Sequence, residues 1–402
     1  MNALQRLFCG PWRAVLVLGV TEIIAWAALF YPPVLTMPLI AAERGWSLAF
    51  AMGGFSFALL VSGSVAPTIG GWIDRFGGHY VMAAGSLVGA LGLVLLTVVE
   101  SRIGYFAVWL VLGLAISANL YDPAFATLGR IFGYKARQSI TALTLAGGFA
   151  STVSWPVTQV LLHWSDWRTT YLIYAAVLAC LCAPLHAFAL PRSRADLQPS
   201  LSPGTPPAPV LPAKGLPFLL VATGFAVYAF VPSGLAAHLL AIFGRAGLDA
   251  ATVVAIGAMF GPAQVAARLC ELFLGRNLHP LSVARIALAL LLVAFALLSL
   301  LGLSVGMAAA FAIMFGAANG LITITRGAVP LALFGPSGYG RVLGRIAKPF
   351  QVIQALAPLA LALVVERASD AAALFVTAAC TAAALICMLA LRAPRGAPPK
   401  AQ

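Results

Sequence analysis

Two opposite charges lie inside a stretch that is otherwise apolar enough to cross a membrane. Residues 255–276 read AIGAMFGPAQVAARLCELFLGR and carry Arg268 and Glu271. A charge at the centre of a membrane helix costs about 2.5–3.5 kcal/mol on insertion scales, so it needs a partner, a water-filled cavity or a function. Arginine suits a carboxylate, because its guanidinium offers two parallel donors to a planar anion and stays charged at any working pH.

Two other roles are open for Arg268. It precedes Arg276 by eight residues, roughly 12 Å along a helix, so its side chain can extend to the inner membrane surface. It can also form a structural pair with Glu271, three residues further on. We favour substrate binding by Arg268, and we expect Glu271 to be an orienting or gate partner before a proton site.

Small and polar residues recur along this stretch at helical spacing. Intervals of 4, 3, 4, 3 and 4 place six residues in one stripe of a helix, namely Gly257, Gly261, Gln264, Arg268, Glu271 and Gly275. The other faces hold Ala, Val, Leu, Met and Phe, which suit lipid. We expect the stripe to face the interior, where its glycines leave room for close helix packing or for substrate.

A second polar stripe lies in the apolar stretch 305–333. It consists of Asn319, Thr323, Arg326 and Pro330. Because Pro330 has no N–H, the carbonyl of residue 326 loses its helix donor, and we expect the helix to break where the charge sits.

The corresponding place in the stretch 103–128 also combines a proline with a charge. Pro123 frees the carbonyl of Asn119, next to Asp122. Two roles compete for Asp122 and Arg326. We favour an ion pair that closes an inner gate, whereas in the alternative Arg326 is a second anion ligand and Asp122 carries a proton. Purely structural pairing is a third possibility.

Glu22 lies about 12 Å past the start of the first apolar stretch. Trp26, Phe30 and Pro33 continue its helix face at +4, +8 and +11. Desolvation there favours the protonated carboxyl, so Glu22 is a candidate proton carrier that titrates near neutral pH. A neutral, hydrogen-bonded Glu22 that braces the first span is an equal alternative.

Other polar residues give weaker signals. Tyr31 and His238 lie toward the outer ends of their spans and can line an outer vestibule, although such residues are more often packing or interface anchors. Asn119, Asn319 and Gln354 can contact substrate, but interhelical hydrogen bonds explain them equally well.

The whole composition requires a membrane around these residues. Of 402 residues, 62% are hydrophobic and 9% are charged, against about 25% charged in soluble proteins. A span needs roughly 20 apolar residues. Twelve spans can be read, at 14–40, 48–72, 80–99, 103–128, 139–162, 170–190, 217–243, 252–275, 285–304, 305–333, 349–365 and 371–391. We therefore expect an all-α membrane protein.

The distribution of Lys and Arg predicts the orientation. With the N-terminus inside, the inner segments hold 17 of them and the outer loops hold 5, which follows the positive-inside rule and puts both termini in the cytoplasm. The net charge of +13 is spread over seven inner segments without one patch. This favours contact with membrane lipid and excludes a nucleic-acid partner.

The longest loop divides the chain into two halves. Residues 191–216 are rich in Pro and Ser and read as a flexible cytoplasmic linker. It separates a six-span bundle over 1–190 from a second bundle, with a short tail, over 217–402. Asn119 matches Asn319, and Phe132-Gly133 matches Phe334-Gly335. Two related halves are typical of carriers with a site at their interface, near the middle of the membrane.

The loop after the second span carries a family motif. It reads GGWIDRFGGHY and resembles the G-x-x-x-D-R-x-G signature of the major facilitator superfamily, with Gly70, Asp74, Arg75 and Gly77 in place. The resemblance implies the fold of two pseudo-symmetric six-helix bundles and a cytoplasmic gate role for Asp74 and Arg75. Gly78-His79 replaces the family's following basic pair. The matching loop GRNLHPLSVAR keeps Gly275 and Arg276 but lacks the Asp.

A finer pattern resembles the monocarboxylate transporter and oxalate/formate antiporter group. Asn119, Pro123, Gly129-Arg130 and Phe132 look like that group's span 4 pattern, and its span 8 arginine aligns with Arg268. The resemblance implies an anion-binding role for Arg268. Monocarboxylate carriers have a proton-coupling Asp four residues earlier, where this chain has Gln264.

Together these features predict a secondary carrier with alternating access in the cell inner (cytoplasmic) membrane. The expected substrate is a small organic anion, with a monocarboxylate favoured and a proton as co-substrate. Arg268 would bind it, with Gln264, Asn119, Asn319 and Tyr31 nearby. Glu22 or Asp122 would couple the proton, and Asp122, Arg326, Glu271, Asp74 and Arg75 would gate. We expect a monomer without cofactor or metal.

Three rival functions compete with this interpretation. The nearest is a drug or metabolite exporter driven by proton exchange. Such exporters often carry G-P-x-x-G-G in span 5, and that element is absent from TALTLAGGFASTVSWPVTQVL. A membrane enzyme would need a nucleophile–base pair or a metal cluster, and neither is visible. A receptor would need an appended signalling domain.

Overall fold

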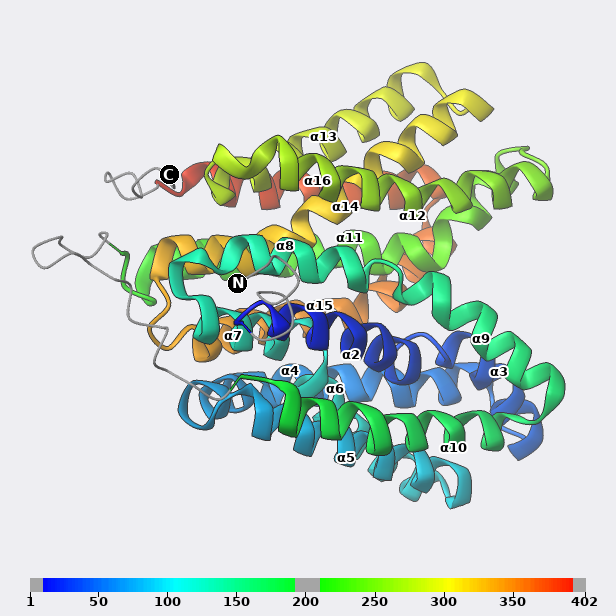
Figure 1. Cartoon of the computed structure of the whole chain (residues 1–402). Coiled ribbons are helices and arrows are strands. Elements are labelled where there is room, and N and C mark those ends of the chain that lie inside the picture. The colour runs from blue at the N-terminus through cyan, green and yellow to red at the C-terminus, as the bar shows by residue number, and fades with distance from the viewer. Residues whose placement is uncertain (1–9, 192–209, 393–402) are drawn as a thin grey trace, which may run out of the picture. The chain divides into compact units, whose positions relative to one another are not determined.

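A computed structural model shows a protein built of helices (Figure 1). It describes residues 10–191 and 210–392, in which there is no β-strand, so the predicted all-α class is confirmed. Eleven helical stretches of this part are long and apolar enough to cross a membrane. One of them, Arg102–Trp164, has 63 residues and would measure about 95 Å if straight. It turns at Gly133, where φ is 56°, and so provides two of the twelve expected spans.

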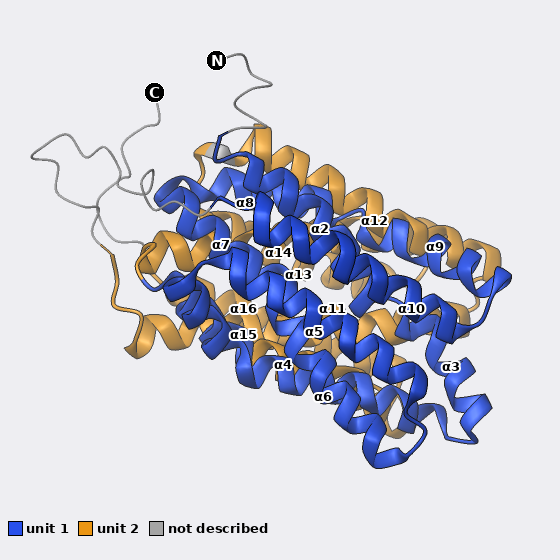
Figure 2. Ribbon diagram, turned by 60° about the horizontal axis from the view of Figure 1, so that its bottom comes forward, with its two compact units in different colours: residues 1–197, 338–348 blue, residues 198–337, 349–402 orange. Residues whose placement is uncertain are grey.

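The chain forms two compact units (Figure 2). The first holds the described residues of 1–197 and 338–348, and the second those of 198–337 and 349–402. Helix α15 (Tyr339–Arg367) therefore begins in the first unit and ends in the second. Most of the expected linker 191–216 lies outside the described residues, and the predicted boundaries at 190 and 217 stay predictions.

The helices of the first unit follow the chain in the order of Figure 1. They are α2 (Arg13–Leu29), α3 (Pro33–Arg44), α4 (Leu48–Phe76), α5 (Gly78–Val98), α6 (Arg102–Asn119), α7 (Tyr121–Phe132), η1 (Gly133–Lys135), α8 (Ala136–Gly147), α9 (Ala150–Trp164), α10 (Trp167–Val177), and the π-helical turns η2 (Leu178–Cys182) and η3 (Leu185–Ala189). The helices after the linker are α11 (Gly215–Arg245), α12 (Ala250–Phe273), η4 (Gly275–Asn277), α13 (Pro280–Leu301), α14 (Val305–Phe334), α15, and α16 (Asp370–Ala390).

The two halves of the chain repeat one helix pattern. Six helix starts in the second half follow their counterparts in the first half at a nearly constant interval, in the pairs Arg13/Gly215, Leu48/Ala250, Gly78/Pro280, Arg102/Val305, Ala136/Tyr339 and Trp167/Asp370. In the first unit α6 packs against both α4 and α5, and in the second α14 packs against both α12 and α13. The same elements therefore occupy corresponding places in the two repeats.

Side-chain caps fix many of these starts. Six residues accept a hydrogen bond from the backbone N–H three positions on, namely Ser47, Ser101, Asp166, Asp249, Ser304 and Ser369. Each bond satisfies one of the N–H groups that a helix start leaves unpaired. The short loops between apolar spans thereby stop one helix and begin the next.

Prolines act differently in the two repeats. Pro123 lies in the first turn of α7, where its missing N–H is not needed, and the helix indeed breaks at Leu120. The break expected at Pro330 is wrong, because α14 continues through that residue to Phe334. A single missing bond near a helix end is tolerated when packing supports the helix.

Candidate functional site

Arg268 is buried between two helices of the second unit. Its side chain is on α12 and is 3% exposed. Nε donates to the carbonyl oxygen of Gly320 on α14 (3.4 Å), and Nη2 donates to Oε1 of Gln264 (3.1 Å). Glu271, three residues on, is 5% exposed. This placement argues against the alternative in which Arg268 extends to the membrane surface.

Glycines of α14, not those of α12, bring the two helices together. A Cβ on Gly320 would lie 2.7 Å from the carbonyl oxygen of Gln264, and one on Gly316 would lie 2.5 Å from that of Phe260. The polar stripe of α12 is buried only at its Arg268 end. No described atom outside the local helix lies within 4 Å of a Cβ on Gly261, which is exposed. Of the two roles predicted for this glycine, room for close packing or room for substrate, the described neighbours give it no packing partner, and the second role stays a prediction.

The polar stripe of α14 has aromatic partners that the sequence did not single out. Tyr228 of α11 donates its hydroxyl to Oδ1 of Asn319 (2.9 Å). The guanidinium of Arg326 lies 4.4 Å from the ring centre of Phe350 on α15, a cation–π distance. Both contacts lie within the second unit. Tyr228 and Phe350 are uncharged, so a search of the sequence for charges inside spans does not identify them.

In the first unit, Glu22 is fully buried and lies among aromatic residues. Its Oε2 accepts a hydrogen bond from Nε1 of Trp26 (2.9 Å). Glu22 and Trp26 therefore lie on the same face of the helix, as their spacing of four residues predicts. The Trp26 ring centre lies 5.0 Å from that of Tyr121 and 5.9 Å from that of Tyr31. Tyr31 itself is half-buried, with its ring 6.1 Å from that of Trp155.

Asp122 lies at the break between α6 and α7. It occupies the first turn of α7, where the positive end of the helix dipole favours a carboxylate. It is half-buried. Asp122 belongs to the first unit and Arg326 to the second, and their pairing stays a prediction.

Asn119 belongs to a buried polar network that joins four elements. Its Oδ1 accepts from the Ser86 hydroxyl (2.8 Å), which lies 3.1 Å from Nδ1 of His186. Nε2 of His186 lies 2.9 Å from the hydroxyl oxygen of Thr21. The four residues are at most 1% exposed and come from α6, α5, η3 and α2. His186 was not expected from the sequence, although a lone histidine in an apolar span was a visible signal.

Asp74 contacts the start of α15. Its two carboxylate oxygens accept the backbone N–H groups of Gly340 (2.8 Å) and Arg341 (2.9 Å). Arg130 donates to the carbonyl oxygens of Ile73 (3.3 Å) and of Asp74 itself. We call the contact of Asp74 with the first turn of α15 the α15 latch.

The remaining motif residues flank the latch. Arg75 is exposed, with its guanidinium 5.0 Å from the ring centre of Phe76. Gly78 packs against Thr127, since a Cβ there would lie 1.9 Å from the Thr127 hydroxyl oxygen. Gly78 stands where the family has the first residue of its basic pair. A larger residue at position 78 would therefore collide with α7.

No group of three or more His, Cys, Asp or Glu side chains within residues 10–191 and 210–392 is arranged to hold a metal ion.

Comparisons with known proteins give the wider context. Human monocarboxylate transporter 11 is 30% identical over 223 residues, which are 51% of this chain and 44% of the relative. Mouse monocarboxylate transporter 4 is 32% identical over 169 residues, or 40% of this chain and 34% of the relative. The chain thus matches less than half the length of these relatives.

Two solved structures share the fold. The human organic anion transporter MFSD10 (TETRAN) superposes with a TM-score of 0.72 at 17% identity, covering 94% of this chain and 99% of the other. The transporter FucP in its outward conformation superposes with a TM-score of 0.71 at 13% identity, covering 93% and 97%.

The family model also matches most of the sequence. The model described as Major Facilitator Superfamily covers residues 15–347, which include both polar stripes and the α15 latch. Homologues and fold are those of transporters and not of enzymes. The chain therefore belongs to the Major Facilitator Superfamily.

Proposed function

We propose that this transporter carries a small organic anion, with a monocarboxylate favoured, together with a proton, by alternating access across the cytoplasmic membrane. It would act as a monomer with both termini in the cytoplasm. The observation that carries the proposal is the burial of Arg268 in a span, held by Gly320 and Gln264. The named likeness to monocarboxylate transporters supports the substrate class.

The geometry at Arg268 fits recognition of a planar anion. Acceptors on two helices hold the guanidinium, so little side-chain entropy remains to be lost when a ligand binds. A substrate carboxylate would replace the amide oxygen of Gln264 as the acceptor of the Nη2 hydrogen. Glu271, one turn on, would keep the arginine oriented, and Asn319 would contact the substrate from α14.

Proton coupling has an electrostatic reason. A lone anion in the span costs several kcal/mol, whereas an anion that moves with a proton is neutral overall. We assign the proton to Glu22, whose carboxyl is buried and accepts a hydrogen bond from Trp26. Asp122 is the second candidate.

Gating would use two contacts. Asp122 and Arg326 would pair when the inner side is closed and separate when it opens. The α15 latch would close in the same state, because Asp74 can accept both N–H groups only while α4 and α15 touch.

Transport into proteoliposomes tests the proposal. Radiolabelled carboxylates of increasing size and their uncharged amides would be offered with and without an inward proton gradient. We expect saturable uptake of small carboxylates that the gradient drives above equilibrium, and no uptake of the amides. Gradient-driven uptake of amides, or no carboxylate uptake under any gradient, would refute the substrate class.

A second comparison tests the coupling residue alone. Glu22→Gln should keep exchange of labelled for unlabelled anion across the membrane but lose accumulation driven by the proton gradient. Asp122→Asn serves as the matched variant. If Glu22→Gln accumulates substrate like the wild type and Asp122→Asn does not, the proton belongs to Asp122.

A further inference from the structure

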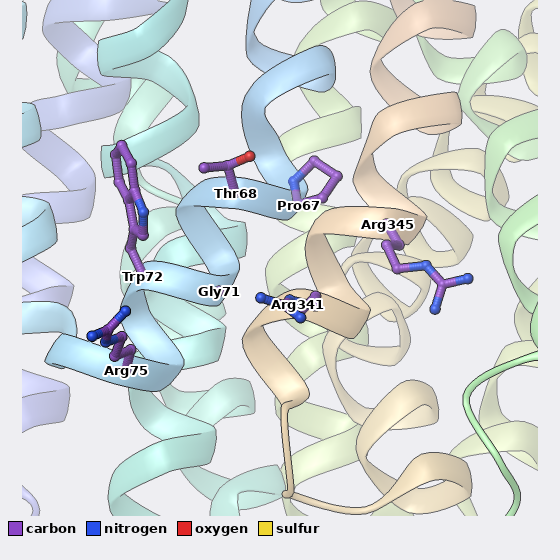
Figure 3. A pocket seen from close by; sticks show the side chains of 7 residues that line it. All are labelled: Pro67, Thr68, Gly71, Trp72, Arg75, Arg341 and Arg345. Carbon is purple, nitrogen blue, oxygen red and sulfur yellow. The ribbon is translucent and has the colours of Figure 1, made fainter.

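A groove lined by arginines lies between the end of α4 and the first turns of α15 (Figure 3). Its volume is about 440 Å³, and its lining includes Arg75 from α4 and Arg341 and Arg345 from α15. All three arginines are exposed. The described residues that line the groove include no Asp or Glu, so the groove suits an anion.

The carboxylate of Asp74 is next to the groove but faces the first turn of α15. Both oxygens of Asp74 accept backbone N–H groups, from Gly340 and Arg341. Its negative charge thus faces the positive end of the α15 dipole. The guanidinium groups keep a net positive potential on the groove side.

Two of the arginines that line the groove come from different helices. Arg341 extends from α15 toward α4 at Gly71, while Arg75 stands on the α4 side below Trp72 (Figure 3). A Cβ on Gly71 would lie 3.2 Å from Nε of Arg341, so the glycine gives this side chain its room. Arg345 points away from α4 in the same view and lies at the rim.

The groove lies where headgroups are expected. Helices α4 and α15 have 29 residues each, about 44 Å of helix against a hydrocarbon core of about 30 Å. Their ends at the groove therefore extend beyond the core. Trp72 is 50% exposed and Phe76 is 48% exposed, and exposed aromatic residues at a helix end are typical of the membrane interface.

We propose that this groove binds the phosphate of an anionic phospholipid, with Arg75 and Arg341 as its two ligands and Trp72 beside the glycerol. Guanidinium groups form bidentate bonds with phosphate oxygens. One phosphate bound from both helices would hold α4 against α15 in parallel with the latch. The proposal is independent of the transported substrate.

Native mass spectrometry of the full chain in detergent tests it, by titration with phosphatidylglycerol and phosphatidylcholine. The wild type should bind phosphatidylglycerol more tightly. Each of Arg75→Gln and Arg341→Gln should weaken that binding roughly fivefold, and the double variant roughly 25-fold. Arg345→Gln should have a smaller effect. Arg392→Gln, which removes an exposed arginine outside the groove, should have none.

A second measurement locates the lipid even if the double variant fails to fold. Brominated phosphatidylglycerol should quench tryptophan fluorescence, and Trp72→Phe should remove a distinct part of that quenching. Equal affinity in the wild type and both single variants would overturn the proposal, as would an equal loss in Arg392→Gln. Displacement of the lipid by equimolar glycerol phosphate would also overturn it, because the site would then serve a soluble anion.

Discussion

The Asp74 carboxylate accepts a 2.8 Å hydrogen bond from the backbone N–H of Gly340, a residue 266 positions away in the chain. The contact is possible because α4 and α15 meet at glycines. A Cβ on Gly70 would lie 1.9 Å from the carbonyl oxygen of Gly340. The signature looks like a short loop motif in the sequence. In the structure its Asp74 binds the first turn of α15, which is far away in the chain.

Gly70→Ala should break this contact. The atom that the new methyl would meet is backbone and cannot turn aside, so α4 and α15 must separate. We expect a loss of about 1–3 kcal/mol of stability, as for other overpacked sites, measured as a lower thermal unfolding midpoint. Gly306→Ala is the control, because no described atom outside the local helix lies within 4 Å of its Cβ position. An unchanged midpoint in Gly70→Ala would show that the helices do not meet there.

The latch illustrates how far sequence reasoning reaches. Gly70, Asp74 and Gly77 were identified because a motif keeps them together in the chain. Their partner was not, since span 11 was expected to begin at residue 349, and α15 begins ten residues earlier, at Tyr339. Arg341 and Arg345 lie in the ten residues before the predicted span. A helix that continues beyond the membrane core can carry such charges on its exposed turns.

His186 should contribute to the stability of the first unit through its two hydrogen-bond contacts, with Ser86 and Thr21. Met388 of α16, in the second unit, is equally buried. His186→Met should lower stability by about 1–3 kcal/mol, because the buried network loses its central member. Met388→Leu should cost less than about 1.5 kcal/mol. Equal midpoints for His186→Met and the wild type would show that the network adds nothing.

Asp166 gives a pH-dependent contribution at the start of α10. The Thr169 backbone N–H donates to Asp166 Oδ1 (2.6 Å) and holds the pKa of that carboxyl below its usual range. A pKa that is lower in the folded state means stability that is present above the unfolded value, about 3.9, and lost as pH falls through the folded value.

Asp166→Ala should therefore cost about 1 kcal/mol at pH 7, and progressively less below about pH 4. Ser369 caps α16 at the equivalent position of the second repeat, and its hydroxyl does not titrate. The difference between wild type and Ser369→Ala should be independent of pH. Thermal midpoints of the three proteins between pH 7 and pH 3 check this, and a constant cost for Asp166→Ala would contradict the capping role.

Each repeat carries an ion pair at the start of its last long helix, with reversed polarity. Arg168 of α10 pairs with Glu43 (2.8 Å) in the first repeat, and Asp370 of α16 pairs with Arg245 (2.9 Å) in the second. Both pairs are exposed, so we expect a coupling energy below about 1 kcal/mol in the double-mutant cycle of Arg168 and Glu43, and a similarly small effect on the thermal midpoint from the pair of Arg245 and Asp370. Charge-swapped double variants should restore the midpoint that each single variant lowers. A coupling of several kcal/mol would mean that burial, and not exposure, governs these pairs.

The charged residues of the candidate site could be predicted from the sequence. The residues that position them through backbone contacts could not. Arg268 and Glu22 were found because membrane spans rarely contain charges. The residues that hold Arg268 in place could not be found, since Gly320 contributes only a backbone carbonyl. Which glycines meet another helix depends on neighbours that a single sequence does not name, and α12 and α14 approach each other at Gly316 and Gly320 of α14.

The uptake kinetics of Arg268 variants test the central claim most directly. Arg268→Lys keeps the charge but loses the paired donors, and should weaken carboxylate uptake about tenfold, while Arg268→Ala should abolish it. Arg285→Lys is the matched control in the same unit, since Arg285 donates only to the Met388 and Leu391 carbonyls among the described partners. Wild-type carboxylate uptake by both Arg268 variants, in protein that still folds, would contradict the account.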